Sequence, residues 1–533
     1  MTIDSLYDKL DKNNFYIGRI SQVYRDNSVA QVENLSLLSH RKIFTESLTP
    51  NTINYLVIID SVRGIFLGEV FQTKVSSSEK LHDSINYGKL ETIFPEISID
   101  IIGVMTHHDK NFRLPEFTTV GVSEKVYLAN RIVIQRYLES IEITRTIEMQ
   151  LQPFATYLDM NEAEVSLKPS TIFDHHMFVV GATNSGKSTS ALSILDKVIN
   201  ANKKTLIIDP TGEYADSFSE EEVKKLNLGI DTTIFPGKLS MQQWSMLFET
   251  NSNTQSAVLA EAIHSLRYQQ KNKQTSYLTK AGQNIAKLQQ QLATVSKTDT
   301  DFDISLLPEQ IAAESVSENR DVFVYDTFKA NVNNYLVQKV TYQLGNTSFL
   351  KFFNHNLQLL DLLDEIYSFV YTPNVSLYIN TSALGAAEGI GGMIIDLICN
   401  YILSQSNIIP FVFFIDEIHR YTKSHSSEEE FHKGLTLVAR EGRKKGIFLF
   451  LTSQNPQDVS PVLLGQIGTM LIHRLTHNDE IRAIKNHLDD YAVKQVKKLN
   501  QGESILTSVN LMRNILLNIT KCNRKQYNGT PLL

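Results

Sequence analysis

The residues best suited to chemistry in this chain are two glycines with the lysine and the hydroxyl that follow them. Gly181, Gly186, Lys187 and Ser188 have the spacing GxxxxGK followed by Ser or Thr. An apolar stretch precedes this turn and a helical pattern follows it, which is the context that a phosphate-binding loop requires. The alternative, a glycine turn with an accidental lysine, is disfavoured by these flanks.

Each residue type in the turn has a physical role. The glycines let the backbone amides point inward, and the dipole of the following helix adds to the attraction for a β-phosphate. Lys187 is expected to bridge the β- and γ-phosphates, and the Ser188 hydroxyl to ligate Mg²⁺. The predicted nucleotide-binding residues are Gly181, Thr183, Asn184, Ser185, Gly186, Lys187, Ser188 and Thr189.

A second element has to complete such a site, namely a carboxylate at the end of an apolar strand. The stretch "IIPFVFFIDEIHR" supplies a buried strand over residues 411–415 that ends at Asp416 and Glu417. We expect Asp416 to hold Mg²⁺ and Glu417 to act as the general base that polarises water. A hydrophobic stretch followed by Asp-Glu is common by chance, but this one follows the phosphate loop at a plausible distance within a domain.

Three further residues follow the next predicted strand. In "KKTLIIDPTGEYAD", Asp209, Gly212 and Glu213 lie just beyond that strand. The carboxyl edge of an open parallel sheet faces the ligand, so these residues could line the nucleotide site. A plain turn after a strand is the alternative.

Downstream, a helix ending in "AREGRKKG" leads into the strand "IFLFLTSQN". Gln454, at the end of that strand, is placed to sense the γ-phosphate or the attacking water. Arg440 and Arg443 could reach the nucleotide of a neighbouring subunit. Cations that stabilise a helix C-terminus are the alternative, and that explanation suits Lys444 and Lys445 equally well.

The elements that position these residues indicate at least two domains. Residues 14–130 contain short, β-branched strands at close spacing, which predicts a small barrel for 1–130. Residues 131–170 are predicted to be a helix and linker. From 171 to 515, strands alternate with helices, which is typical of a mostly parallel sheet covered on both faces. Residues 516–533 form a C-terminal extension.

Residues 216–320 interrupt this alternation with glutamine-rich helical patterns, and they are predicted to be a helical insertion. The glutamines could also indicate a coiled coil, but fewer than three heptads keep their pattern. A solvated helix face is the favoured interpretation. The segment "SKTDTDFD", residues 296–303, is predicted to be a loop.

Other patterns carry no chemistry. The GxGG cluster in "GAAEGIGGM", residues 385–393, lacks the GxGxxG register and favours a helix-entry turn. Neither the adjacent histidine pairs (107/108 and 175/176) nor the 473/477 pair has metal-ligand geometry, and Cys399 and Cys522 lack CxxC spacing. No apolar run is long enough to span a membrane and no signal pattern begins the chain, so a cytoplasmic location is expected.

The 533 residues carry a formal net charge of −7, which argues against a surface that is basic all over. A basic channel inside an acidic shell remains compatible with that charge. Composition therefore neither indicates nor excludes nucleic acid as a partner.

The order of these motifs resembles the HerA branch of the HerA/FtsK superfamily of hexameric, RecA-like DNA-translocating ATPases. The matching stretches are "HHMFVVGATNSGKSTS", "LIIDPTGEY", "FFIDEIHRY", "AREGRKKGIFLFLTSQNPQDVSPVLLGQIGTMLIHRL" and "LNQGESIL". The predicted barrel is similar to the HAS-barrel domain of that family. The resemblance implies an α/β fold, a RecA-like P-loop NTPase core with a helical insertion after a small N-terminal β-barrel.

The resemblance also implies roles and partners. ATP and Mg²⁺ are the implied cofactors, with Lys187 and Ser188 on phosphate and metal, Asp416 and Glu417 as the acidic pair, and Gln454 as the sensor. Arg443 or Arg440 is implied as the arginine supplied from a neighbouring subunit. A homohexamer, DNA, and a partner nuclease or effector are the implied partners. Two departures are the sequence Asp174-His175 where the family often has Arg before His, and Asn184 where a glycine is common.

Two functions follow as hypotheses. The first is an ATP-driven DNA translocase or helicase motor that works with a partner nuclease or effector in DNA processing or anti-phage defence. The second is an ATPase scaffold that organises and regulates a nuclease or a NAD-consuming, sirtuin-like effector without substantial DNA unwinding. Pore loops that carry lysine or arginine toward DNA would favour the first.

Overall fold

A computed structural model describes the chain at residues 3–7, 12–43, 46–48, 50, 52–75, 79–106, 108–143, 146–158, 163–248, 250, 254–345, 347–353, 358–384, 390–422 and 433–527. The chain divides into two compact units. Unit 1 comprises Met1–Ile172 with Ser504–Asn518, and unit 2 comprises Phe173–Glu503 with Ile519–Leu533. This division differs from the predicted one, because residues 131–172 are part of unit 1 and the chain returns to unit 1 well before residue 515.

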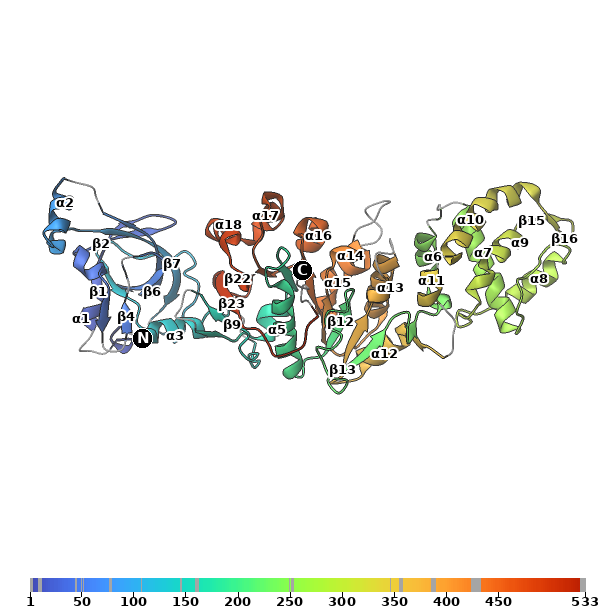
Figure 1. Ribbon diagram of the computed structural model, residues 1–533, viewed down its shortest axis with the longest axis horizontal. Helices are drawn as coiled ribbons and strands as arrows, with labels where there is room; N and C mark the ends of the chain where they lie inside the picture. Colours follow the sequence, from blue (N-terminus) through green and yellow to red (C-terminus); the bar gives the residue numbers. More distant parts are fainter. Residues whose placement is uncertain are drawn as a thin grey trace, which may run out of the picture. The chain divides into compact units, whose positions relative to one another are not determined.

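Unit 1 contains a closed antiparallel barrel of six strands, drawn in blue tones in Figure 1, in the order β1-β2-β7-β6-β5-β8. Its core is built from β-branched residues, and Ile17, Ile20, Ile97 and Ile99 are 1% exposed or less. The predicted barrel is confirmed. Its strands are β1 (Tyr16–Val23), β2 (Ser28–Val32), β5 (Tyr55–Ser61), β6 (Gly64–Lys74), β7 (Glu96–Met105) and β8 (Lys125–Leu128).

The rest of unit 1 joins segments that are far apart in the sequence. Helix α3 (Arg131–Glu139) begins after Asn130, whose side chain accepts a hydrogen bond from the Val133 amide. Strand β9 (Ala155–Tyr157) lies between β10 (Glu164–Val165) and β23 (Ile515–Ile519), and β22 (Glu503–Ser508) follows β23 in the sheet. The predicted linker at 131–170 is therefore packed structure.

Unit 2 is built on seven parallel strands in the order β21-β11-β20-β19-β12-β18-β13. Every residue of β11, β12 and β19 is buried, as expected for a sheet covered on both faces. The predicted α/β core is confirmed. The strands are β11 (Met177–Val180), β12 (Thr205–Asp209), β13 (Val223–Asn227), β18 (Ser376–Asn380), β19 (Phe411–Ile415), β20 (Ile447–Ser453) and β21 (Thr469–Ile472).

Three crossover helices cover this sheet. Helix α5 (Lys187–Asn200) leads from β11 across to β12, whereas α13 (Ile390–Ser404) and α15 (Lys433–Lys445) connect strands in the opposite direction across the sheet. Right-handed crossovers therefore place α5 on one face and α13 and α15 on the other. Helices α13 and α15 pack against each other.

The helical insertion follows β13 and precedes β18. Its start differs from the predicted residue 216, because β13 pairs with β18 in the main sheet, and it extends well past residue 320. Trp244 stacks on Phe248 in its core, with ring centroids 5.6 Å apart. Its helices, at the right of Figure 1, are α6 (Met241–Leu247), α7 (Gln255–Lys271), α8 (Ile285–Leu292), α9 (Leu307–Ala313), α10 (Thr327–Gly345) and α11 (Thr347–Phe352). Helix α12 (Leu362–Tyr371) follows the insertion and packs on α13 beside the sheet.

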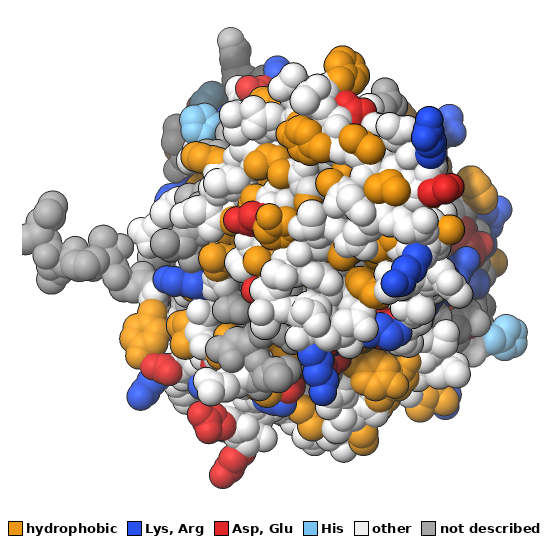
Figure 2. Space-filling model, turned by 90° about the vertical axis from the view of Figure 1, so that its right-hand side faces the viewer, with side chains coloured by type: hydrophobic (Ala, Val, Ile, Leu, Met, Phe, Trp, Pro, Cys, Tyr) orange, Lys and Arg blue, Asp and Glu red, His pale blue; other side chains and the backbone are white. Residues whose placement is uncertain are grey.

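Figure 2 shows hydrophobic side chains spread among charged ones over the face on which the insertion lies. Helix α10 contributes to the exposed apolar surface of the insertion, because Phe328, Tyr335 and Tyr342 follow one another at intervals of seven residues and are all exposed. Its opposite side buries Leu336 and Val340 and packs on α9 and α7.

Several patterns without predicted chemistry can be placed. Residues 385–389 of the glycine cluster and His107 lie outside the described residues, and residues 390–393 begin α13. Cys399 is buried and Cys522 is partly exposed, and neither forms a disulfide in the described chain. Among the described residues, no helix is both long and apolar enough to cross a membrane.

Deletion of residues 1–130 is expected to impair assembly or partner binding while it spares nucleotide binding. The physical reason is that every predicted nucleotide-site residue belongs to unit 2. Light scattering and binding of a fluorescent ATP analogue test this, with the full chain as control. A truncated chain that forms the same assemblies and binds the same partners would contradict it.

Candidate functional site

The turn between β11 and α5 requires its glycines for two different reasons. A Cβ on Gly181 would lie 2.5 Å from Ser185 Oγ and 2.6 Å from His473 Cβ, so that position has no room for a side chain. Gly186 has a φ of +104°, which L side chains rarely adopt. Asn184 has a φ of 64°, and asparagine tolerates this left-handed conformation, which explains how it replaces a glycine here.

The beginning of α5 is open to an anion. Gly186 is the N-cap residue, and no side chain caps the helix. The first amides of a helix have no partner within the helix, and the helix dipole favours negative charge at that end. The turn therefore fits a phosphate group in both shape and charge.

A buried ion pair joins this turn to the end of β19. Lys187 Nζ contacts Glu417 Oε1, and the two side chains are only 6% and 7% exposed. Gln454 Nε2 donates to the same Glu417 oxygen at 3.0 Å, and Thr183 Oγ1 donates to Gln454 Oε1 at 3.0 Å. Three strands, β11, β19 and β20, thus bring together four residues that are separated by up to 271 positions.

The charge state of Glu417 follows from these contacts. Burial acts to raise its pKa, but His419, whose Nδ1 lies 3.1 Å from Glu417 Oε2, and the Lys187 charge outweigh burial and lower the pKa to about 2. Glu417 is therefore ionised at neutral pH. Its backbone has a φ of 44°, a left-handed conformation that costs about 1–3 kcal/mol in a residue other than glycine and is concentrated at functional sites.

The neighbouring carboxylate is held differently. Asp416 is 1% exposed, and its Oδ1 accepts a hydrogen bond of 2.5 Å from Thr452 Oγ1. Its Oδ2 forms no hydrogen bond with any described residue. Burial, opposed in part by the Lys187 charge, raises the pKa of Asp416 to about 7. A buried carboxylate oxygen with no partner fits a cation ligand.

The donor set favours a particular kind of metal. Ser188 lies in the first turn of α5 and Asp416 follows β19 directly, so one hydroxyl and one carboxylate are the predicted protein ligands. Among the described residues, no group of three or more His, Cys, Asp or Glu side chains could hold a metal. Mg²⁺ in proteins is usually bound by one or two protein oxygens together with phosphate oxygens of the substrate.

The loop after β12 is organised by Asp209. This fully buried carboxylate accepts hydrogen bonds from the Thr211, Gly212 and Tyr214 amides and from the Tyr378 hydroxyl. Asp209 therefore shapes the loop rather than facing a ligand.

Glu213 is a loop residue on which Lys187 and Ser188 of the phosphate turn act electrostatically. Burial and the Asp209 charge raise its pKa, while Lys187 and Ser188 act in the opposite direction. Gln526 Nε2 donates to Glu213 Oε1 at 2.9 Å.

Sequence analysis missed several residues of the site. Thr452 accepts a hydrogen bond from the Glu417 amide at 2.9 Å in addition to binding Asp416. His473 is fully buried against Gly181, its Nδ1 lies 3.0 Å from the Glu503 carbonyl oxygen, and burial lowers its pKa to about 4. The Gly502 amide donates to the Ser185 carbonyl at 3.1 Å. The only available signal was the position of Thr452 and His473 at strand ends.

The arginines of α15 do not join this site within one chain. Arg440 and Arg443 are exposed, and the Arg443 charge acts on His175 and His176, which precede β11. The phosphate turn follows β11, so Arg443 lies toward the other end of that strand. His176 is fully buried and bonds the Ala439 carbonyl and the Leu449 amide, which is a structural role.

Comparison with known proteins finds relatives among helicases. Residues 154–342 match the family model "Helicase HerA, central domain", a range that includes the phosphate turn and ends before Asp416. The chain is 21% identical over 470 residues to "Probable DNA double-strand break repair helicase HerA" of Methanocaldococcus jannaschii, covering 79% of this chain and 84% of that protein.

Two further relatives are covered less completely. The chain is 22% identical over 365 residues to "Probable helicase MJ1565" of the same organism, covering 65% of this chain. It is 23% identical over 348 residues to "DNA double-strand break repair helicase HerA" of Saccharolobus solfataricus, covering 63% of this chain. The chain spans 62% of the length of each of these two proteins. In fold, it is similar to VirB4 of Thermoanaerobacter pseudethanolicus, with a TM-score of 0.51 and 13% identity over 72% of this chain and 99% of that one.

Two substitutions separate binding from catalysis. Lys187→Ala is expected to abolish nucleotide hydrolysis and leave the fold intact, because it removes the charge that bridges the phosphates. Glu417→Gln is expected to keep ATP binding and lose hydrolysis, since the amide preserves the shape but cannot accept a proton.

Phosphate release and binding of a fluorescent ATP analogue measure the two effects, with circular dichroism as the control for folding. Wild-type turnover in folded Lys187→Ala protein would contradict the assignment. Equal loss of binding in both variants would contradict separate roles.

Proposed function

The chain is a HerA-like ATPase of the HerA/FtsK superfamily, and from this premise we propose that it hydrolyses ATP to move DNA through a ring of six identical subunits. The single observation that carries the ATPase part is the meeting of Lys187, Glu417 and Gln454 at the carboxyl edge of one parallel sheet. Ligands bind at that edge in open α/β sheets.

The proposed chemistry uses the residues of this edge in sequence. The amides of residues 183–187 and the Lys187 ammonium bind the phosphates of ATP, and the γ-phosphate competes with Glu417 for Lys187. Glu417 is then free to accept a proton from the attacking water, which Gln454 orients. Ser188 and Asp416 would hold Mg²⁺, which would neutralise phosphate charge.

A second subunit has a role in this proposal. Arg443 is exposed and lies away from the site of its own chain, so it is available to a neighbouring chain. Without such an arginine, only Lys187 and the metal would stabilise the negative charge that develops on the γ-phosphate during hydrolysis. An arginine supplied from another subunit raises the rate by about 10³-fold or more in related chemistry. Arg440, one turn earlier on α15, is the alternative donor.

The partners of the ring are a further part of the proposal. The net charge of −7 argues against a surface that is basic all over, and we propose that DNA contacts a basic channel inside the ring. Unit 1 holds none of the nucleotide-site residues, and we propose it as the docking surface for a partner nuclease or a sirtuin-like effector. DNA processing and anti-phage defence are the processes that such a pair would serve.

DNA dependence of the ATPase distinguishes a motor from a scaffold. The purified chain with Mg²⁺ is expected to release phosphate several-fold faster when duplex DNA is present, because translocation couples ATP hydrolysis to movement along DNA. Glu417→Gln protein is the control for contaminating ATPases. A rate unchanged by DNA, in preparations that bind DNA, would favour the scaffold function instead.

Mixed rings test the arginine. Arg443→Ala and Glu417→Gln proteins are each expected to be inactive, whereas mixtures are expected to recover part of the hydrolysis. The reason is that some interfaces then join an intact Glu417 to an intact Arg443. Phosphate release measures recovery, and native mass spectrometry verifies that subunits exchange. If the mixtures stay inactive although the subunits exchange, Arg443 does not act across the interface. Its role would then be to stabilise the C-terminus of α15.

A further inference from the structure

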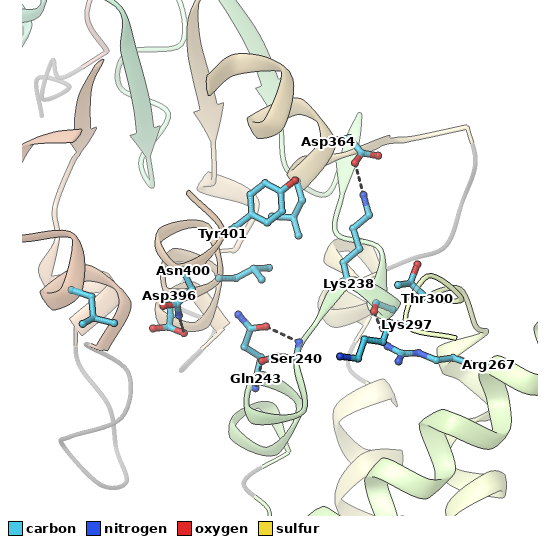
Figure 3. Close-up of a pocket in the computed structure, with 14 residues that line it drawn as sticks. Lys238, Ser240, Gln243, Arg267, Lys297, Thr300, Asp364, Asp396, Asn400 and Tyr401 are labelled. Carbon is cyan, nitrogen blue, oxygen red and sulfur yellow. Dashed lines mark hydrogen bonds and ion pairs between the residues drawn. The ribbon is translucent and has the colours of Figure 1, made fainter. Parts of the chain in front are cut away.

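A cavity of about 730 Å³ lies in unit 2, lined by the insertion and by helices α12, α13 and α15. None of the nucleotide-site residues described above lines it. Figure 3 shows Arg267 and Lys297 on one side of the cavity and Asp396 and Asn400 on the other. Its volume lies within the range of about 300–1,000 Å³ that small-molecule sites occupy.

Arg267, on α7, is the residue that sets this cavity apart. Its guanidinium is partly buried and donates to the Gly237 carbonyl oxygen at 2.8 Å. Its Nε forms no hydrogen bond with any described residue. Burial lowers the pKa of Arg267, which means that the charge is held at an energetic cost. No carboxylate of the described chain forms an ion pair with it.

The other charges of the cavity do not supply the missing partner. Lys238 is neutralised by Asp361 at 2.8 Å and Asp364 at 2.6 Å. Asp396, across the cavity, accepts hydrogen bonds from the Gly434 amide and from Asn400, each at 2.8 Å. Lys297 is exposed and forms no ion pair among the residues that the structure describes. The insertion side therefore carries two cations without an internal counter-charge.

The remaining lining groups suit an organic anion. Ser240 and Thr300 also line the cavity, and their hydroxyls can donate to an oxyanion. Leu363, Leu397 and the Tyr401 ring provide apolar surface from α12 and α13. Hydrogen bonds from a guanidinium to phosphate are among the strongest in proteins, and arginine is the preferred residue for them.

We propose that this cavity binds a phosphorylated small molecule. Arg267 and Lys297 hold the phosphoryl group, and the organic part lies against Tyr401 and Leu397. Because one wall belongs to the insertion and the other to α12, α13 and α15, the ligand links the insertion to the sheet core. The site does not depend on nucleotide hydrolysis at the phosphate turn.

The test uses the full chain carrying Lys187→Ala, which weakens phosphate binding at the other site. Inorganic phosphate and AMP are the probes, and isothermal titration calorimetry measures their affinity. Trp244, the only tryptophan of the chain, follows the lining residue Gln243 in α6, so its fluorescence reports binding at this cavity. Saturable binding of both probes is expected, with AMP tighter because of the apolar wall.

Substitutions locate the binding. Arg267→Gln and Lys297→Gln are each expected to weaken both probes by about tenfold or more, because each removes one charge-assisted contact. Arg320→Gln, at an exposed arginine of the insertion, is the matched control and is expected to change nothing. Lys297 is exposed, so its variant tests the proposal even where Arg267→Gln perturbs folding.

Three outcomes would overturn the proposal. One is absence of binding for both probes at concentrations of about 10 mM. Another is an affinity that Lys297→Gln and Arg267→Gln leave unchanged. Equal affinity for phosphate and AMP would overturn the assignment of the organic part to the apolar wall.

Discussion

The buried contact between Lys187 and Glu417 is the interaction around which the carboxyl edge of the unit 2 sheet is arranged. These two opposite charges are 6% and 7% exposed, and each offsets the cost of burying the other. One partner begins α5 and the other follows β19, so the sheet has to hold the ends of β11 and β19 in register. Strand β20 lies between them and supplies Gln454 and Thr452. A parallel sheet meets this constraint because it gathers strand ends at one edge.

Local sequence patterns predicted the strands and turns of this edge. The site residues that these patterns missed reach the edge through contacts between segments far apart in the sequence. The phosphate turn and the strand before Asp416 are continuous stretches, so spacing and hydrophobicity suffice to find them. His473 and Gly502 reach the turn only because β21 lies beside β11 and residue 502 folds back onto Ser185. The insertion begins later than predicted because β13, whose sequence "VKKLN" has two adjacent lysines and no clear strand pattern, pairs with β18 at the edge of the main sheet.

Three cations of unit 2 illustrate different ways to hold a buried charge. Lys187 is neutralised by Glu417, a partner for which phosphate can substitute. Arg524 is neutralised permanently, with Asp196 at 2.6 Å and Glu222 at 2.8 Å, and its guanidinium lies 4.7 Å from the centre of the Phe218 ring. Arg267 has only a backbone carbonyl. The first and the last are the arrangements that leave a charge available to a ligand, whereas the second fixes a segment in place.

The Arg524 contacts have a consequence for biosynthesis. The ribosome makes Arg524 328 residues after Asp196, the α5 residue that it neutralises, and Gly502 also emerges long after the phosphate turn. A nascent chain therefore holds Asp196 with only the neighbouring Lys197, at 3.0 Å, as an ion-pair partner among the described residues while several hundred further residues are translated. The contacts that Gly502 makes with the phosphate turn and that Arg524 makes with α5 can therefore form only late in translation.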